Sequence, residues 1–304
     1  MFQGNERLRA EGELVTYTKE LIQEYIRCKE DIIYFAEKYF YITTIDDGKI
    51  KIPLWEFQKK VLKAFIKPPK NRRHIIMMMP RQQGKTTIST VYLLHYMLFN
   101  KDKNVAILAN KKDTALEIMQ RVKMAFESLP TWLQQGIKEG GWNKSSIRLE
   151  NGMVMKASTT SSDSISGDTV SLLYMDEFAK VKSHIAEEFI TATYPVISSG
   201  KTSKIIMVST PLGMNHFYEF WVKARRGIKG DLKNGNNFYP IKVRWQDHPK
   251  RDQEWKDEII RDIGPTRFNQ EYGCVEFGSY INIRDKNTGE IEKIKIGDFY
   301  NRLK

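Results

Sequence analysis

A stretch in the first third of the chain combines the residue types that bind nucleotide phosphates. An apolar run, Ile75 to Met79, ends at Pro80, and a helical pattern of apolar residues begins at Ile88. Between them lies Arg-Gln-Gln-Gly-Lys-Thr-Thr, residues 81–87. In a strand–turn–helix arrangement of this kind, backbone N–H groups and the helix N-terminus point at anionic oxygens. The motif therefore predicts a phosphate-binding loop.

The residues of this loop have separate expected roles. Lys85 would reach the β- and γ-phosphates of ATP, and the Thr86 hydroxyl would ligate Mg²⁺. The other candidate nucleotide-binding positions of the loop are Arg81, Gln82, Gln83, Gly84 and Thr87. The usual pattern has a second glycine five residues before Gly84, where this chain has Met79. Taken alone, the motif could therefore also be a chance Gly-Lys-Thr in a turn.

Two adjacent acids end another apolar run. The segment from Val170 to Met175 is typical of a buried strand, and Asp176 and Glu177 follow it. Opposite a phosphate loop, Asp176 would hold Mg²⁺ through its water shell, and Glu177 would orient and deprotonate the attacking water. The alternative is an Asp-Glu pair that caps the next helix. The upstream Gly-Lys-Thr favours the catalytic interpretation.

Two further positions could contact the nucleotide. The apolar run that begins at Lys204 ends in Ser209, Thr210 and a proline. At the carboxyl edge of a parallel sheet, these hydroxyls would lie near the γ-phosphate and could sense its loss. Gln58 lies early in an expected helix, and an amide side chain can both donate to and accept from the adenine edge. For each position alone, an ordinary strand end or a solvent-facing glutamine is the simpler explanation.

The elements that must position these residues alternate between strands and helices. Apolar residues at helical spacing predict helices at 12–40 (two), 55–65, 88–98, 115–129, 217–228 and 252–273, the last broken at Gly264-Pro265. Short apolar runs predict strands at 75–79, 104–109, 170–176, 204–211 and 239–245, with a hairpin at 142–157 that turns at Asn151-Gly152. This order predicts an α/β fold in which helices cover both faces of a parallel sheet.

Composition and charge set further limits. Charged residues at 28% and apolar residues at 41% are typical of a soluble globular protein. No apolar run approaches the length of a membrane span, and the N-terminus lacks a hydrophobic signal core. Cys28 and Cys274 lie far apart, which favours a reducing compartment. The net charge of +12 favours a polyanionic partner, although a generally basic surface would explain it equally well.

Four motifs, in this order, resemble one family. They are Trp-Glu-Phe-Gln at 55–58, Pro-Arg-Gln-Gln-Gly-Lys-Thr-Thr at 80–87, Leu-Leu-Tyr-Met-Asp-Glu at 172–177 and Ser-Thr-Pro-Leu-Gly at 209–213. Together they are similar to the ATPase domain of the large terminase subunit, the genome-packaging motor of tailed bacteriophages, especially of the myovirus type. The resemblance covers residues 50–278 and accounts for Met79, because this family replaces the early glycine. It implies a P-loop NTPase fold of the ASCE type, with a small lid subdomain, and ATP and Mg²⁺ as cofactors.

The resemblance also implies roles for single residues. Arg81 would act in cis to stabilise charge on the γ-phosphoryl group, beside Lys85 and Glu177 as the other catalytic residues. Gln58 would read the adenine, and Ser209 with Thr210 would couple hydrolysis to motion. Ser166 departs from the family, which often has an arginine before Gly167.

At the level of the whole protein, the resemblance implies an ATP-driven translocase of double-stranded DNA. It would assemble as a ring on the capsid portal protein, work with a small terminase subunit, and act in the cytoplasm of the bacterial host. The implied parts are a helical N-terminal segment (1–50), an ATPase core (51–213), a lid (214–278) and a tail (279–304). Too few residues follow Gly278 for the nuclease domain of this family, so no nuclease activity is expected from this chain.

Two alternatives stay open for the function, and one for the tail. A helicase-like translocase of repair or restriction would share the same core. A non-hydrolysing nucleotide-binding assembly module would not need an acid such as Glu177 to position water. The tail from Cys274 resembles the start of an intein, in which a thiol performs the first acyl shift. Cys274 also fits the end of a terminase ATPase domain.

Overall fold

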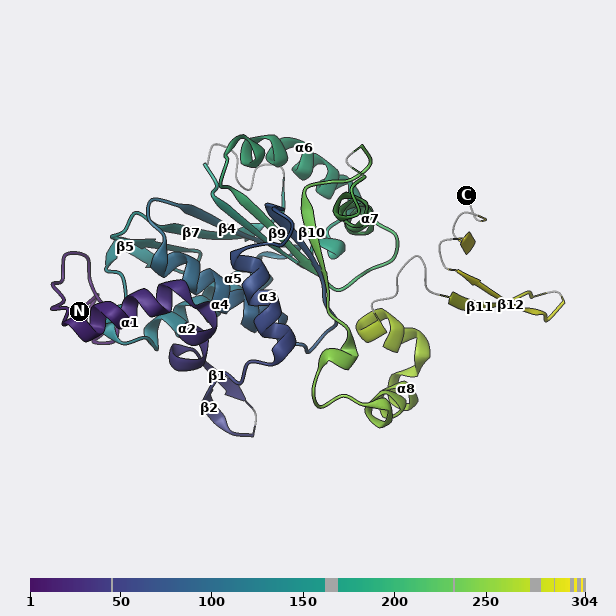
Figure 1. Cartoon of the computed structure of the whole chain (residues 1–304), viewed down its shortest axis with the longest axis horizontal. Helices are drawn as coiled ribbons and strands as arrows, with labels where there is room; N and C mark the ends of the chain where they lie inside the picture. Colours follow the sequence, from purple (N-terminus) through teal and green to yellow (C-terminus); the bar gives the residue numbers. More distant parts are fainter. Residues whose placement is uncertain are drawn as a thin grey trace.

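The central element of the fold is a large sheet. A computed structural model describes residues 1–44, 46–161, 169–231, 233–273, 280–286, 288–295, 298–299 and 302. Within these residues, the sheet has the strand order β10-β3-β9-β8-β4-β7-β6-β5. Its strands are β3 (His74–Met78), β4 (Asn104–Ala109), β5 (Ile137–Asn143), β6 (Ser146–Leu149), β7 (Val154–Thr159), β8 (Leu172–Asp176), β9 (Lys204–Ser209) and β10 (Phe238–Lys242). Figure 1 labels five of these strands, β4, β5, β7, β9 and β10. The strands predicted from apolar runs are confirmed.

The direction of the strands differs between the two ends of the sheet. Every neighbouring pair from β10 to β7 is parallel, as the alternation of strands and helices predicts. At the other end, β7, β6 and β5 form an antiparallel meander. The predicted hairpin at 142–157 is thus confirmed as β6 and β7, and it gives the mostly parallel sheet an antiparallel end. The short turn at Asn151-Gly152 reverses the chain, whereas a parallel pairing needs a long crossover.

Helices cover both faces of the sheet, as predicted. They are α1 (Lys19–Glu30), α2 (Ile32–Tyr39), α3 (Glu56–Ile66), α4 (Lys85–Phe99), α5 (Lys112–Glu127), α6 (Ser183–Ser199), α7 (His216–Ile228) and α8 (Gln253–Phe268). Helices α2, α3, α4 and α5 pack on one face with Ile75 and Met77 of β3, while α6 and α7 pack on the other with Ile76 and Met78. Successive residues of β3 thus enter opposite cores, which explains why this strand is apolar throughout.

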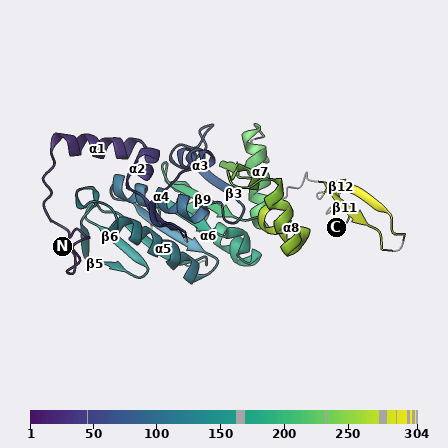
Figure 2. The same cartoon turned by 90° about the horizontal axis from the view of Figure 1, so that it is seen from below.

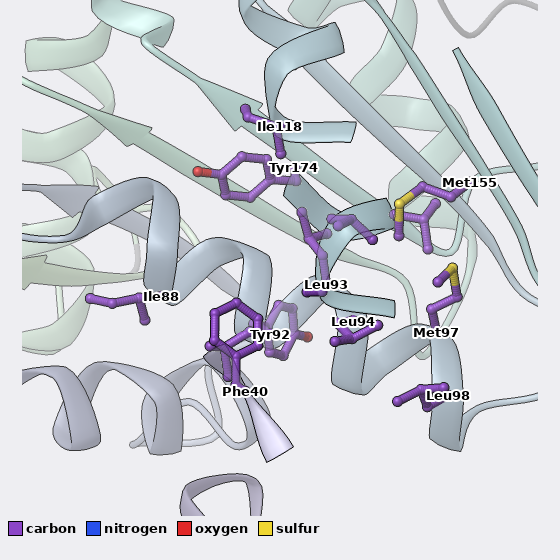
Figure 3. Packing of buried hydrophobic residues seen from close by; sticks show 14 of the residues in the cluster. Phe40, Ile88, Tyr92, Leu93, Leu94, Met97, Leu98, Ile118, Met155 and Tyr174 are labelled. Atoms are coloured by element: carbon purple, nitrogen blue, oxygen red, sulfur yellow. The ribbon is translucent and has the colours of Figure 1, made fainter. Parts of the chain in front are cut away.

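Helix α4, which follows the phosphate loop, is the most deeply enclosed of these elements. Tyr92, Leu93, Leu94 and Met97 are at most 1% exposed (Figure 3). A helix that is apolar on all sides belongs in a core. The helix is buried almost throughout from Ile88 onward, so the half-buried first turn and the loop before it stand on a rigid base.

The remaining elements lie around this core. They are β1 (Tyr41–Thr44) with β2 (Gly48–Lys51), β11 (Tyr280–Arg284) with β12 (Ile291–Lys295), the turns η1 (Thr131–Leu133), η2 (Phe178–Lys180) and η3 (Trp245–Asp247), and the π-helical turn η4 (Asn269–Gly273). The hairpin of β11 and β12 extends away from the sheet, beyond α8 (Figure 2).

Gly264 has φ 79° and ψ 158° inside α8, which confirms the predicted break in this helix. None of the helices in the described parts is long and apolar enough to cross a membrane.

Two buried histidines should make the fold sensitive to acid. Burial lowers the pKa of His74 and of His95 to about 4, against 6.5 for a free histidine. Between these values the unfolded chain binds more protons than the folded one, so the free energy of unfolding falls as the pH falls from 6.5 towards 4. The loss expected is on the order of 3 kcal/mol for each histidine. Thermal unfolding followed at several pH values measures it.

The matched variants for this prediction are His95→Gln and His184→Gln. His95 bonds the carbonyl of Cys28 through Nε2 at 3.0 Å, and a glutamine amide can also donate to that carbonyl without titrating. His184 is exposed. His95→Gln should reduce the fall in the free energy of unfolding between pH 6.5 and 4. His184→Gln should leave that fall as it is in the wild type. Equal acid dependence in both variants would contradict the prediction.

Candidate active site

The predicted site residues meet at the carboxyl ends of three neighbouring strands. β3 pairs with β9, and β9 pairs with β8, all in parallel. The backbone N–H of Met79, just after β3, donates to the carbonyl of Ser209 at the end of β9 (3.1 Å). Asp176 is the last residue of β8. The phosphate loop, the two acids and the Ser-Thr pair therefore leave the sheet side by side.

The loop itself has the backbone that a phosphate site requires. Gln82 and Gly84 lie in the left-handed region, with φ 56° and 77°. A Cβ atom on Gly84 would lie 2.5 Å from Nε2 of Gln58, so only glycine fits there. The Gln83 side chain is buried and donates to the carbonyls of Arg244 (3.2 Å) and Trp245 (3.4 Å). These contacts hold the loop against the segment that follows β10.

Lys85 lies between the two acids. Its ammonium forms an ion pair with Asp176 Oδ1 at 3.3 Å and a shorter one with Glu177 Oε1. The three side chains are 13%, 5% and 15% exposed. The predicted convergence of these residues at one place is thus present in the structure.

The electrostatics of this cluster follow from two carboxylates and one ammonium in a buried place. Burial lowers the pKa of Lys85, but the charges of Asp176 and Glu177 outweigh it and raise the pKa overall. Burial raises the pKa of Glu177, but Lys85 and then Lys180 outweigh it and lower the pKa overall. For Asp176, burial together with the charge of Glu177 outweighs Lys85, and the pKa is raised. Lys180 supplies a second cation to Glu177, and Asp176 is the acid of this cluster that lies deepest.

A carboxyl at the strand end beside a phosphate loop, as Asp176 is, fits a divalent cation. Magnesium in nucleotide sites takes one or two protein ligands and completes its shell with phosphates and water. Thr86 lies half-buried in the first turn of α4, and Asp176 is buried at the strand end. In the described part of the chain, no group of three or more His, Cys, Asp or Glu side chains could hold a metal alone. A cation here would therefore depend on the phosphates of a ligand.

Glu177 receives two further contacts that position its carboxylate. The Thr210 hydroxyl donates to Oε2 at 3.2 Å, and the Lys180 ammonium lies 3.1 Å from the same atom. Glu177 itself has φ 51°, the left-handed region that is strained for a residue with a side chain. Ser209 is buried, and its hydroxyl accepts from the Ala179 N–H at 3.2 Å. Ser209 and Thr210 thus connect the end of β9 to Glu177 and to the turn that follows it.

Gln58 and Arg81 lie at the loop, but apart from the carboxylates. Gln58 is 4% exposed, donates from Nε2 to the Gln83 carbonyl (3.2 Å) and accepts from the Trp55 N–H at Oε1 (3.1 Å). Its amide is therefore engaged with the protein, and the adenine role stays a prediction. The Arg81 side chain is 52% exposed and forms an ion pair with Glu271 Oε2 at 2.5 Å. The cis-acting role of Arg81 likewise stays a prediction.

Comparison with known proteins identifies the family. The family described as "Terminase large subunit, T4likevirus-type, N-terminal" matches residues 76–287. The chain belongs to this family. The large terminase subunits of Thermus phage G20c and Thermus virus P23-45 are each 32% identical to it over 128 residues, 40% of this chain. The matched segment spans 25% of the length of these relatives.

Solved terminases share the fold. The large terminase of bacteriophage HK97 has a TM-score of 0.64 at 15% identity, over 83% of this chain and 56% of that one. The ATPase domain of the Thermus phage P74-26 large terminase has a TM-score of 0.53 at 22% identity, over 70% and 92%. None of these similarities involves an intein, and the family match continues past Cys274 to residue 287. Cys274 and Ser166 lie outside the described residues, so their predicted features stay predictions.

Three residues of this terminase site were not among those predicted from the sequence. Lys180 follows Glu177 by three positions, and that spacing within a turn is the signal that could have found it. Tyr174 lies two residues before Asp176, on the same face of the strand, and its hydroxyl bonds Ser89 Oγ at 2.7 Å and Asp176 Oδ1 at 3.5 Å. Glu271 has no local signal, because its partner Arg81 is distant in the sequence.

Proposed function

We propose that this chain hydrolyses ATP and that the hydrolysis drives double-stranded viral DNA into a procapsid. The observation that carries the proposal is the convergence of Lys85, Asp176 and Glu177 at the end of a preformed phosphate loop. Family membership supports the same activity. A related fold, the large terminase of the thermophilic bacteriophage D6E, has been solved with ADP and with ATP-γ-S.

Each residue of the site would have a separate role in ATP hydrolysis. Loop N–H groups and Lys85 bind the phosphates, so the ammonium exchanges its carboxylate partners for phosphate oxygens. Thr86 and Asp176 would hold Mg²⁺, which neutralises charge on the phosphates when it is bound. Glu177, freed from Lys85 and still held by Thr210 and Lys180, then orients water and accepts its proton.

The test of this proposal is phosphate release from ATP by the full chain, with Mg²⁺ and with EDTA. We expect turnover that requires Mg²⁺. Equilibrium binding of a fluorescent ATP analogue, measured in parallel, separates this outcome from the alternative of an inert nucleotide-binding module. Tight binding without any phosphate release would favour that module and overturn the proposal.

A basic surface of this chain matches the DNA backbone, and it lies at the amino end of β3, whereas the site lies at the carboxyl ends of the strands. The connector before β3 lies against the end of α7, because Lys70 Nζ donates to the Ile228 carbonyl (3.1 Å) and Arg72 donates to the Gly227 carbonyl (2.5 Å). We define this basic surface by the exposed cations of the connector, of α7 and of the loop that follows it: Lys67, Lys70, Lys223, Arg226, Lys229 and Lys233. Clustered cations of this kind bind phosphate backbones without reading sequence.

Reversing two charges on this surface should weaken DNA binding. We expect Arg226→Glu with Lys229→Glu to lower the affinity for double-stranded DNA about tenfold or more and to reduce the salt slope by about 2, because two phosphate contacts are lost. Arg225 is half-buried and engaged, so it is left unchanged. The control is Lys101→Glu with Lys144→Glu, two exposed lysines away from this surface. Equal losses in both double variants would mean that only net charge matters.

The remaining parts of the proposal concern assembly. A homo-oligomeric ring, the portal protein and a small terminase subunit are the partners that a packaging motor requires, and the host cytoplasm, transiently at the procapsid portal, is the place of action. The proposed parts are the N-terminal helical segment at 1–50, the core at 51–213, the lid at 214–278 and the tail at 279–304. Co-purification with portal protein at near-stoichiometric yield would test the assembly.

A further inference from the structure

The C-terminal helical segment, residues 251–273, contacts the phosphate loop directly. The Arg81 N–H donates to the Glu271 carbonyl at 3.1 Å, and the Arg81 Nε lies 2.5 Å from Glu271 Oε2. The backbone and the side chain of Arg81 are thus bound to the same residue of η4. No other element contributes a polar contact to the Arg81 side chain in the described part of the structure.

A second set of contacts fixes the segment against the loop. Arg251 donates from Nη1 to the Arg81 carbonyl (3.3 Å) and from Nη2 to the Gln82 carbonyl (3.1 Å). Its guanidinium lies over the rings of Trp255 (4.4 Å) and Tyr272 (5.3 Å). The Tyr272 hydroxyl in turn donates to Gln82 Oε1 at 3.4 Å. Glu271 is therefore not a loose side chain that meets Arg81 by chance, because its own turn is anchored to the same loop.

Glu271 contacts Arg81 at Nε and not at the terminal nitrogens of the guanidinium. A guanidinium presents five N–H donors, and its two terminal nitrogens form a fork that matches a phosphate. Glu271 engages Nε, which leaves both Nη groups without a recorded polar partner among the described residues. A carboxylate at Nε fixes the plane of the guanidinium while the fork stays available for an anion.

We propose that Glu271 is a positioning residue that orients Arg81 towards the transferred phosphoryl group. The proposal rests on the proposed ATPase function and assigns part of its catalytic geometry to the C-terminal helical segment. Holding a long side chain in one rotamer in advance removes an entropic cost from the transition state. The segment would therefore set the turnover rate through the direction of one arginine, and movement of the segment would change that rate.

The test is the steady-state kinetics of Glu271→Ala in the full chain. We expect kcat to fall on the order of tenfold to a hundredfold with little change in KM, because misplacement of a catalytic group affects the chemical step. In an Arg81→Ala background, Glu271→Ala should cause no further loss. Glu271→Gln should recover part of the rate, since its amide oxygen can still accept from Nε. The matched control is Glu258→Ala, an exposed acid on the same segment, which should behave as the wild type.

The other outcomes overturn the inference. Equal losses from Glu271→Ala with and without Arg81 would show that Glu271 acts through general stability. An increase in kcat would show that Glu271 restrains Arg81 instead of orienting it. An unchanged kcat would remove Glu271 from the mechanism. If the wild type released no phosphate at all, the proposed ATPase function would be contradicted. An active wild type with unchanged kcat in Glu271→Ala would contradict only the positioning role, so the two outcomes can be told apart.

Discussion

Replacing Glu177 by glutamine should lower ATP turnover by about 10²- to 10⁴-fold, the usual contribution of a general base. Glutamine is nearly the same size as glutamate and can still accept the hydrogen bond from the Thr210 hydroxyl, so the packing of the turn should persist. It cannot take a proton from water at neutral pH. Nucleotide affinity should stay within about threefold of the wild type, because the phosphate contacts come from the loop and from Lys85. Phosphate release and equilibrium binding measure the two quantities separately.

The matched control for this variant is Glu188→Gln. Glu188 is an exposed acid on α6, so the same chemical change there should leave turnover unaltered. Equal turnover in wild type and Glu177→Gln would remove Glu177 from catalysis and favour a binding module. A large loss of affinity in Glu177→Gln would instead mean that the acid holds the loop in shape.

The phosphate loop and the strand-end acids could be predicted because each depends on a short, continuous stretch of sequence. An apolar strand followed by Gly84-Lys85-Thr86 and an apolar helix favours a tight turn from strand to helix. The run that ends at Asp176 likewise has to leave the sheet at the same edge, because parallel strands place their carboxyl ends together. Knowing the strands therefore places Lys85 at the same edge of the sheet as the two acids, whereas the order β3-β9-β8 that brings them into contact comes from the structure.

The parts that could not be predicted depend on contacts between distant residues. Tyr272 and Gln82 are 190 positions apart, and no spacing rule connects them. The engagement of the Gln58 amide by the loop depends on how α3 packs, which periodicity does not give. Helix α6 contains Pro195, a residue that normally argues against a helix interior, and β5 has two glycines; neither element was predicted.

Replacing Lys85 by alanine should abolish hydrolysis, with a loss of at least about a thousandfold, because the ammonium stabilises charge that develops on the transferred phosphate. The variant also removes the cation that pairs with both Asp176 and Glu177. Breaking a buried ion pair on one side costs about 3–5 kcal/mol, so Lys85→Ala should be less stable as well as inactive. Thermal unfolding must accompany the activity measurement.

A second variant, Lys85→Arg, separates the two effects. Arginine keeps a positive charge beside the carboxylates, so stability should be largely retained. Its planar guanidinium does not reproduce the compact ammonium that fits between loop and phosphates, and turnover should therefore still be lost. A folded Lys85→Arg protein without activity would attribute the loss to phosphate binding and not to unfolding. Normal turnover in Lys85→Ala would overturn the assignment of the phosphate loop, and normal turnover in Lys85→Arg would show that any cation at this position suffices.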